Sequence, residues 1–402
     1  MSAKFGIESI ELKFRDIYME YYYHLHRNPE LSYQEKETAR YIAEKLRALP
    51  MDEIKTGVGG FGITASLKGG KPGPVVALRA DMDALSMLET SGAAFASEKP
   101  GVTHSCGHDA HMAMLLGSAH VLCEIKNELP GTIKFIFQPS EETTPRGGAL
   151  GMIEDGVLEN PRVNAIIGMH VWPSYETGQI GAQDGVVSAT SDRLKIKITG
   201  KSAHASMPHE GTDAIVASAA VVQALQNIIS RRIDPRDTAV VTIGTIQGGS
   251  RHNVIPEEVF LEGTVRTFTP SVTAIMPGLI EETAVSAARA CGAVAEVCYE
   301  SGYPSVVNDH EVSKICRDAI VEVAGKDGLL PVQSVPASGE DFSFFAQKVP
   351  ASFAWLGCRP KGIAPADMPQ LHNTAFLPDP QALPLGVRYF AVAAVELLEK
   401  YK

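Results

Sequence analysis

The segment from 104 to 111 (HSCGHDAH) contains three histidines, a cysteine and an aspartate within eight residues. Imidazole, thiolate and carboxylate groups side by side are the ligand types of a transition-metal site. Gly107 allows the backbone to turn sharply between them. The apolar run over 112–122 that follows is long enough for a buried helix. The segment therefore indicates a metal-binding loop that leads into a core helix, with a helix start carrying scattered polar residues as the alternative.

Short apolar runs elsewhere in the chain predict buried strands, and residues of metal-ligand type follow them. These residues are Asp81 and Asp83 after 75–78, Glu141 and Glu142 after 132–137, and His170 after 164–169. Ligands of open α/β sheets bind beyond the carboxyl ends of strands, so we expect these side chains to lie close together. Each placement alone has an ordinary explanation, such as an Asp-rich turn or a solvated pair of glutamates. The repeated placement is what favours a common site.

The number of candidate ligands exceeds the needs of one metal ion, which takes three or four. The strongest candidates are Cys106, His108, Glu142, His170 and His372. This number favours two metal ions with a shared ligand, and the Cys106 thiolate has lone pairs for two cations. Two ions about 3.5–4 Å apart hold a hydroxide between them and polarise a carbonyl group. If Glu142 is a ligand, the adjacent Glu141 is the natural group to move a proton to the leaving amine.

Composition restricts the class of protein. The 402 residues are too many for one ordinary core, so we expect two domains. The net charge is −11 without any basic cluster, which argues against nucleic acid or an anionic membrane as a partner. We expect no signal peptide, no transmembrane helix and no disulfide scaffold, because neither a long uncharged apolar run nor small-scaffold cysteine spacing is present. A cytoplasmic protein is the resulting prediction.

The pattern of strands and helices divides the chain into two predicted domains. Residues 1–185 and 300–402, with a late strand expected over 332–335, have α/β texture and predict a mixed sheet flanked by helices. Residues 186–299 instead follow β-α-β-β-α-β order, which predicts an inserted ferredoxin-like α+β domain. Three polar clusters stand out in this domain, around His204, Asn253 and Arg266. Arginine suits bidentate recognition of a carboxylate.

Ten motifs occur in order between residues 24 and 373: HLHRNPELSYQE, RADMDAL, HSCGHDAHMAMLLG, FQPSEE, GMHVWP, GKSAHASMP, NVIP, GTVRTF, SGEDFSFF and LHN. Through them nearly the whole chain resembles the aminoacylase–carboxypeptidase family of dinuclear metallohydrolases. More narrowly, it is similar to the amidohydrolase branch that contains hippurate hydrolases and indole-acetyl-amino-acid hydrolases. The resemblance implies two divalent metal ions (zinc, manganese, cobalt or nickel) and Glu141 as general base and acid. The implied metal ligands are Cys106, His108, Glu142, His170 and His372.

The resemblance also implies roles outside the ligand set. The inserted domain would be a lid that provides the interface of a homodimer or higher homo-oligomer. His204 would stabilise the oxyanion, in related enzymes often across the dimer. Asn253 and Arg266 would hold the free carboxylate of the substrate. Supporting roles fall to Asp83, Asp109 and His111, whereas His104 remains unassigned.

These features predict a two-metal hydrolase that cleaves the amide bond of N-acyl amino acids with a metal-bridging water activated by Glu141. A metallo-carboxypeptidase or dipeptidase acting on short peptides with a free carboxylate is an alternative with the same site. A thiol hydrolase with Cys106 as nucleophile would leave Glu142, His170 and His372 without a role. A non-catalytic binding protein would need neither Glu141 nor His204.

Overall fold

The computed structural model describes residues 5–331 and 336–402, so the strand expected over 332–335 lies outside the described residues. The chain forms two compact units. Unit 1 comprises Met1–Val187, Val306–Ser334 and Asp341–Lys402, and unit 2 comprises Ser188–Ser305 with Val335–Glu340. Unit 2 extends past the expected segment 186–299 at its carboxyl end because its last strand continues to Tyr303.

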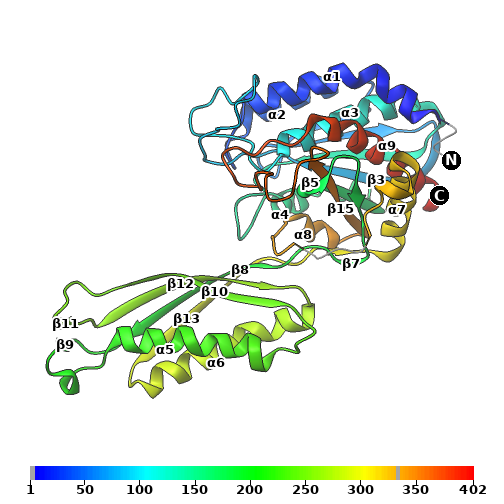
Figure 1. Cartoon of the computed structure of the whole chain (residues 1–402). Helices are drawn as coiled ribbons and strands as arrows, with labels where there is room; N and C mark the ends of the chain where they lie inside the picture. The colour runs from blue at the N-terminus through cyan, green and yellow to red at the C-terminus, as the bar shows by residue number, and fades with distance from the viewer. Residues whose placement is uncertain (1–4, 332–335) are drawn as a thin grey trace. The chain divides into compact units, whose positions relative to one another are not determined.

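A seven-stranded mixed sheet forms the centre of unit 1, with the order β1-β2-β4-β3-β5-β15-β6 (Figure 1). Its strands are β1 (Glu53–Val58), β2 (Gly62–Lys68), β3 (Lys71–Asp81), β4 (Pro130–Gln138), β5 (Ala165–Glu176), β6 (Ile180–Gly181) and β15 (Ala351–Arg359). The four central strands β4, β3, β5 and β15 are parallel, and the outer strands pair antiparallel. Parallel strands are covered on both faces, which explains why these four are continuous apolar runs in the sequence.

Helices cover both faces of this sheet (Figure 1). One face packs against α1 (Ile7–Arg27), α2 (Lys36–Arg47), α3 (His108–Glu124), α7 (His310–Ala324) and α9 (Leu383–Lys400). The other face packs against α4 (Ala149–Glu154) and α8 (Phe342–Ala346). Successive residues of a strand point to opposite faces, and accordingly Val76 lies in the first core and Val75 in the second. The predicted mixed sheet flanked by helices is confirmed.

Within residues 5–331 and 336–402, two segments are apolar and long enough to cross a membrane by composition alone, Pro380–Lys400 and Ala214–Arg232. The first is 78% buried over its most apolar part, and its Val387 and Phe390 belong to the core of unit 1. Its apolar character is therefore that of a core helix. The second segment is 33% buried and packs one face in the core of unit 2.

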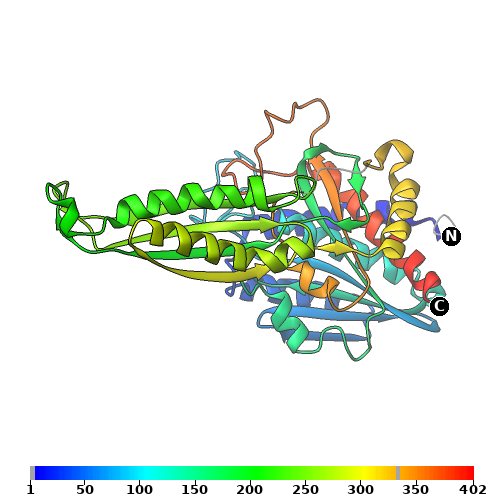
Figure 2. The ribbon, with the colours of Figure 1, turned by 90° about the horizontal axis from the view of Figure 1, so that it is seen from below.

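Unit 2 has a four-stranded antiparallel sheet with the order β10-β12-β8-β13. Its elements are β8 (Ser191–Thr199), α5 (Ala214–Asn227), β10 (Ala239–Gly248), β12 (Glu258–Thr267), α6 (Pro270–Ala290) and β13 (Val294–Tyr303). The two helices lie side by side on one face of the sheet (Figure 2). A short ladder of β9 (Ala203–His204) with β11 (Val254–Ile255) follows the carboxyl end of β8. In this β-α-β-β-α-β order both helices cover the same face of the sheet, which is why apolar and polar residues alternate along its strands.

Candidate metal centre

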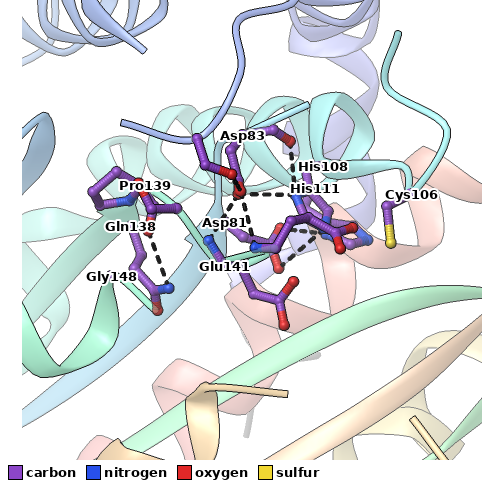
Figure 3. Close-up of polar contacts among 12 residues, drawn as sticks. Asp81, Asp83, Cys106, His108, His111, Gln138, Pro139, Glu141 and Gly148 are labelled. Carbon is purple, nitrogen blue, oxygen red and sulfur yellow. Dashed lines mark hydrogen bonds and ion pairs between the residues drawn. The ribbon is translucent and has the colours of Figure 1, made fainter. Parts of the chain in front are cut away.

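Polar side chains at the ends of β3 and β4 and at the start of α3 lie close together in unit 1 (Figure 3). His170 of the neighbouring strand β5 joins them beside Cys106. Among the described residues, five groups of three side chains have potential ligand atoms within 4.8 Å of one another, and two of these groups share Cys106. The first group is Cys106, His108 and His170, and the second is Cys106, Glu142 and His372. Together the two groups contain the five residues expected as ligands, and Cys106 belongs to both.

Gly107 brings the loop before α3 against β5. Its φ of +86° is left-handed, and a Cβ atom at this position would lie 2.4 Å from the Val171 side chain. Only glycine fits such a close approach. The approach places the Cys106 sulfur 3.4 Å from Nε2 of His170. His170 itself lies inside β5 and not at its end, because the strand continues beyond Met169 to Glu176.

Backbone carbonyl groups orient two of the candidate histidine ligands. Nδ1–H of His108 donates to the Asp83 carbonyl oxygen at 2.9 Å, and Nδ1–H of His170 donates to the Val171 carbonyl oxygen at 2.6 Å. In each ring Nε2 is the nitrogen left for a metal ion. Nε2 of His108 is buried and has no hydrogen-bond partner among the described residues. An orphaned buried nitrogen of this kind fits a metal ligand.

His111 differs because both of its ring nitrogens are used. Nδ1–H donates to Asp81 at 2.6 Å, and Nε2 accepts the backbone N–H of Val171 at 2.9 Å. Asp81 also accepts a hydrogen bond from Arg79 at 2.8 Å. His111 therefore connects α3 to β3 and β5, and neither of its ring nitrogens is left for a metal ion. The supporting role expected for His111 from the sequence stays a prediction.

The carboxylates around the site favour the binding of positive charge. Burial alone would lower the pKa of His108, but Asp81, Asp83 and Glu142 raise this pKa to about 10. Burial raises the pKa of the Cys106 thiol well above its ordinary value, and the carboxylates of Glu142 and Glu141 raise it further. A divalent cation would replace the proton on His108 and favour the thiolate, so the donor set fits metal ions.

A strained turn presents Glu141 and Glu142 after β4. Ser140, just before them, has φ +59°, a conformation that costs on the order of 1–3 kcal/mol for a residue other than glycine. His372 has a similar φ of +61°, and its N–H donates to the Ser105 carbonyl oxygen at 2.9 Å. Nε2 of His372 lies 3.1 Å from the Glu142 carboxylate. Backbone strain thus occurs at two segments that carry candidate ligands, as it does at many functional sites.

Asp109 lies beside His108 in the sequence but faces away from the candidate ligands. Its carboxylate contacts Nδ1 of His26 at 2.6 Å, and Nε2 of His26 contacts Glu89 at 3.1 Å. Asp109 therefore joins the start of α3 to α1. A histidine near the end of a helix is ordinarily a surface or capping group, but His26 is fully buried. In the sequence, the indication that His26 has a specific role is its position in the HLH part of the first motif.

The three residues expected to reach the substrate from unit 2 do not meet within that unit. His204 pairs with Val254 beside Asn253 in the β9–β11 ladder. Arg266 lies at the opposite end of β12, half-buried, where its guanidinium donates to Thr264 and to the Val265 carbonyl oxygen. The strand from Glu258 to Arg266 alone spans roughly 26 Å at about 3.3 Å per residue. One copy of unit 2 therefore cannot bring Asn253 and Arg266 to the same carboxylate.

Comparisons with known proteins define the family. The sequence profile of peptidase family M20/M25/M40 matches residues 77–396. N-acetylcysteine deacetylase of Bacillus subtilis is 38% identical over 384 residues, which are 94% of this chain and 96% of that protein. Thermostable carboxypeptidase 2 of Saccharolobus solfataricus is 39% identical over 381 residues, or 94% of each chain. A crystal structure of a dinuclear metal-binding peptidase of the M20 family from Bacillus subtilis covers 96% of this chain and 99% of its own, with 36% identity and a TM-score of 0.83.

The chain therefore belongs to peptidase family M20/M25/M40 and is a hydrolase. The resemblance inferred from the ordered motifs is confirmed. The structural match extends over both units, so it supports the α/β fold of the whole chain.

Proposed function

We propose that this protein is a two-metal hydrolase that cleaves the amide bond of N-acyl amino acids. The observation that carries the proposal is the pair of ligand groups that share Cys106. One divalent ion would be held by Cys106, His108 and His170, and the other by Cys106, Glu142 and His372. Zinc, manganese, cobalt and nickel all suit this mixture of sulfur, nitrogen and oxygen ligands.

Glu141 would be the proton carrier of this site. When bound, two divalent ions lower the pKa of a water molecule and polarise the substrate carbonyl. A Glu141 carboxylate oxygen lies within 4.8 Å of potential ligand atoms of both His108 and Glu142. Glu141 would take a proton from the attacking water as the new C–O bond forms. It would then give the proton to the amine nitrogen as the C–N bond breaks.

The substrate class is tested with two matched panels. The relatives are named a deacetylase of N-acetylcysteine and a carboxypeptidase, so an N-acyl amino acid and a short peptide are the two candidates. We expect higher kcat/KM for N-acetyl and N-benzoyl amino acids than for dipeptides with the same carboxyl-terminal residue, in protein loaded with each of the four metals. Higher kcat/KM for the dipeptides would assign the carboxypeptidase or dipeptidase activity instead.

Metal removal separates this proposal from thiol chemistry. A nucleophilic cysteine needs a lowered pKa, whereas the surroundings of Cys106 raise it. Chelation should therefore abolish hydrolysis, and adding a divalent ion should restore it. Full activity in protein without metal would support Cys106 as a nucleophile.

Arg266 would bind the free carboxylate of the substrate. Arg266→Ala should raise KM about 10–100-fold, because a charge-assisted contact contributes about 1.5–3 kcal/mol. The matched control is Arg193→Ala, which removes an exposed arginine of β8 that pairs with Glu262 and should leave KM unchanged. The rates are measured on one N-acyl amino acid and on its carboxyl-amidated form. If wild-type protein used both forms equally well, Arg266 would have no such role.

Two copies of the chain would complete the substrate site. Since Arg266 lies far from Asn253 within one unit 2, a second copy is needed to supply His204 and Asn253. Exposed apolar side chains on unit 2, among them Val240 and Ile246 on the edge strand β10, support an interface there. We therefore include a homodimer, or a higher homo-oligomer built from it, in the proposal.

Mixing two inactive variants tests the shared site. Subunits with His204→Ala combined with subunits with Glu141→Gln should recover about a quarter of wild-type activity. Half of the randomly formed dimers are mixed, and each mixed dimer has one intact site. Mixed dimers are verified by two different affinity tags. Verified mixed dimers without recovered activity would mean that His204 acts within its own subunit or not at all.

The net charge and the free cysteines support the assignments of partners and cellular location. The net charge of −11 disfavours nucleic acid as a partner. All six cysteines are free thiols, which supports a cytoplasmic location.

A further inference from the structure

The turn that contains the two glutamates of the candidate site has three consecutive backbone N–H groups that donate to buried carboxylates. Ser140 N–H donates to Glu35 at 2.7 Å. Glu141 N–H and Glu142 N–H donate to the two carboxylate oxygens of Asp83 at 3.0 and 2.9 Å. Glu35 and Asp83 are 0% and 1% exposed. The turn is therefore held from two sides, and Figure 3 shows Asp83 beside Glu141.

Glu35 precedes α2 but does not cap it. A short polar side chain at this position, such as that of aspartate or serine, ordinarily accepts N–H groups of the first helical turn. Here Glu35 makes no such bond, and Glu30 accepts the N–H groups of Glu37 at 3.2 Å and Thr38 at 2.8 Å instead. The Glu35 side chain is thereby available for Ser140, which lies 105 residues further along the chain.

The hydrogen bonds of Ser140 can hold the residue in its strained backbone conformation. Its hydroxyl donates to Glu35 at 3.0 Å and accepts the N–H of Tyr33 at 2.9 Å, in addition to the backbone bond. A residue with a side chain stays at φ +59° only when its surroundings impose that conformation. The segment 33–35 makes three hydrogen bonds to this one residue and is therefore suited to impose it.

We propose that Glu35 is a positioning residue that holds Ser140 in its left-handed conformation and thereby directs Glu141 and Glu142 into the metal site. The inference rests on the proposed function for the roles of these two glutamates. It gives the segment HLHRNPELSYQE a function that the ligand set does not explain. Glu35 itself touches neither substrate nor metal in this scheme.

Glu35→Gln and Glu35→Met form a matched pair. Glutamine keeps the accepting oxygen, and it replaces an Oε2 atom for which the described residues offer no hydrogen-bond partner. Methionine has a similar length and no comparable acceptor. We expect Glu35→Gln to retain the kcat and zinc affinity of the wild-type protein. Glu35→Met should lower zinc affinity, titrated into metal-free protein, about 10–100-fold. Its kcat in metal-saturated protein should fall by a similar factor with KM unchanged.

The outcomes separate positioning from general stabilisation. Wild-type zinc affinity and kcat in folded Glu35→Met would overturn the inference, even if its melting temperature fell. Equal losses in Glu35→Gln and Glu35→Met would also overturn it, because the accepting oxygen would then not matter. If Glu35→Met does not fold, Glu35→Asp takes its place, since its shorter carboxylate does not reach Ser140. If wild-type protein hydrolyses neither panel, the proposed function fails, and the zinc titrations still test Glu35.

Discussion

Glu141→Gln should lower kcat about 10²–10⁴-fold while the protein keeps its metal ions. General acid–base catalysis contributes a factor of this size, and an amide cannot take up and return the proton. The substitution keeps the shape of the side chain and leaves the Glu141 N–H bond to Asp83 in place. The measurements are kcat on an N-acyl amino acid and metal content by mass spectrometry on the same sample.

Glu142→Gln is the matched control one residue further on. It makes the same chemical change in a residue assigned as a metal ligand, so metal content should fall together with activity. The pair therefore separates proton transfer from metal binding. A metal-loaded Glu141→Gln variant with near-normal kcat would remove Glu141 from the mechanism.

Arg79→Met should destabilise unit 1 by about 3–5 kcal/mol, because it leaves buried carboxylates without their cation. Arg79 is 1% exposed and donates to Gln138 at 2.9 Å and to Asp81 and Asp341 at 2.8 Å each. Asp341 in turn accepts the N–H groups of Gly148 and Ala149 at 3.0 Å. The network therefore links β3, β4 and the start of α4.

Tryptophan fluorescence reports this unfolding selectively. The two tryptophans of the chain, Trp172 and Trp355, both lie in unit 1 with ring centroids 4.8 Å apart. Arg40→Met is the control, since Arg40 forms exposed ion pairs on α2 and should contribute far less. Equal shifts of the urea midpoint in the two variants would show that the buried network stabilises unit 1 no more than a surface pair does.

Features set by local chemistry were predictable from the sequence. The central strands were visible because burial on both faces makes them continuous apolar runs. The candidate ligands were visible because their residue types are rare together and follow those runs. Gly107 belongs to the same class, since a sharp turn between polar side chains favours glycine.

Features set by distant contacts were not predictable in the same way. The edge strand β1 (EIKTGV) is mostly exposed and has no apolar run to mark it. The role of Glu35 depends on Ser140, and that of His26 depends on Asp109, each brought near only by the fold. The separation of Arg266 from Asn253 follows from the register of β12 in its sheet. The roles implied by the family resemblance place Arg266 and Asn253 at one substrate carboxylate and do not reveal how far apart the two residues lie in one unit 2.

As a ligand of both ions, the sulfur atom common to the two groups would make both ions dependent on one redox state. Oxidation of Cys106 to a sulfenic or sulfinic acid would take a ligand from both positions in a single event. Losing any of the other four assigned ligands would weaken one position only. Such an enzyme would therefore depend on a reducing environment, and peroxide treatment should release both ions together. The same sulfur couples metal loading, because the first ion to bind would already have displaced the thiol proton that the second would otherwise have to displace.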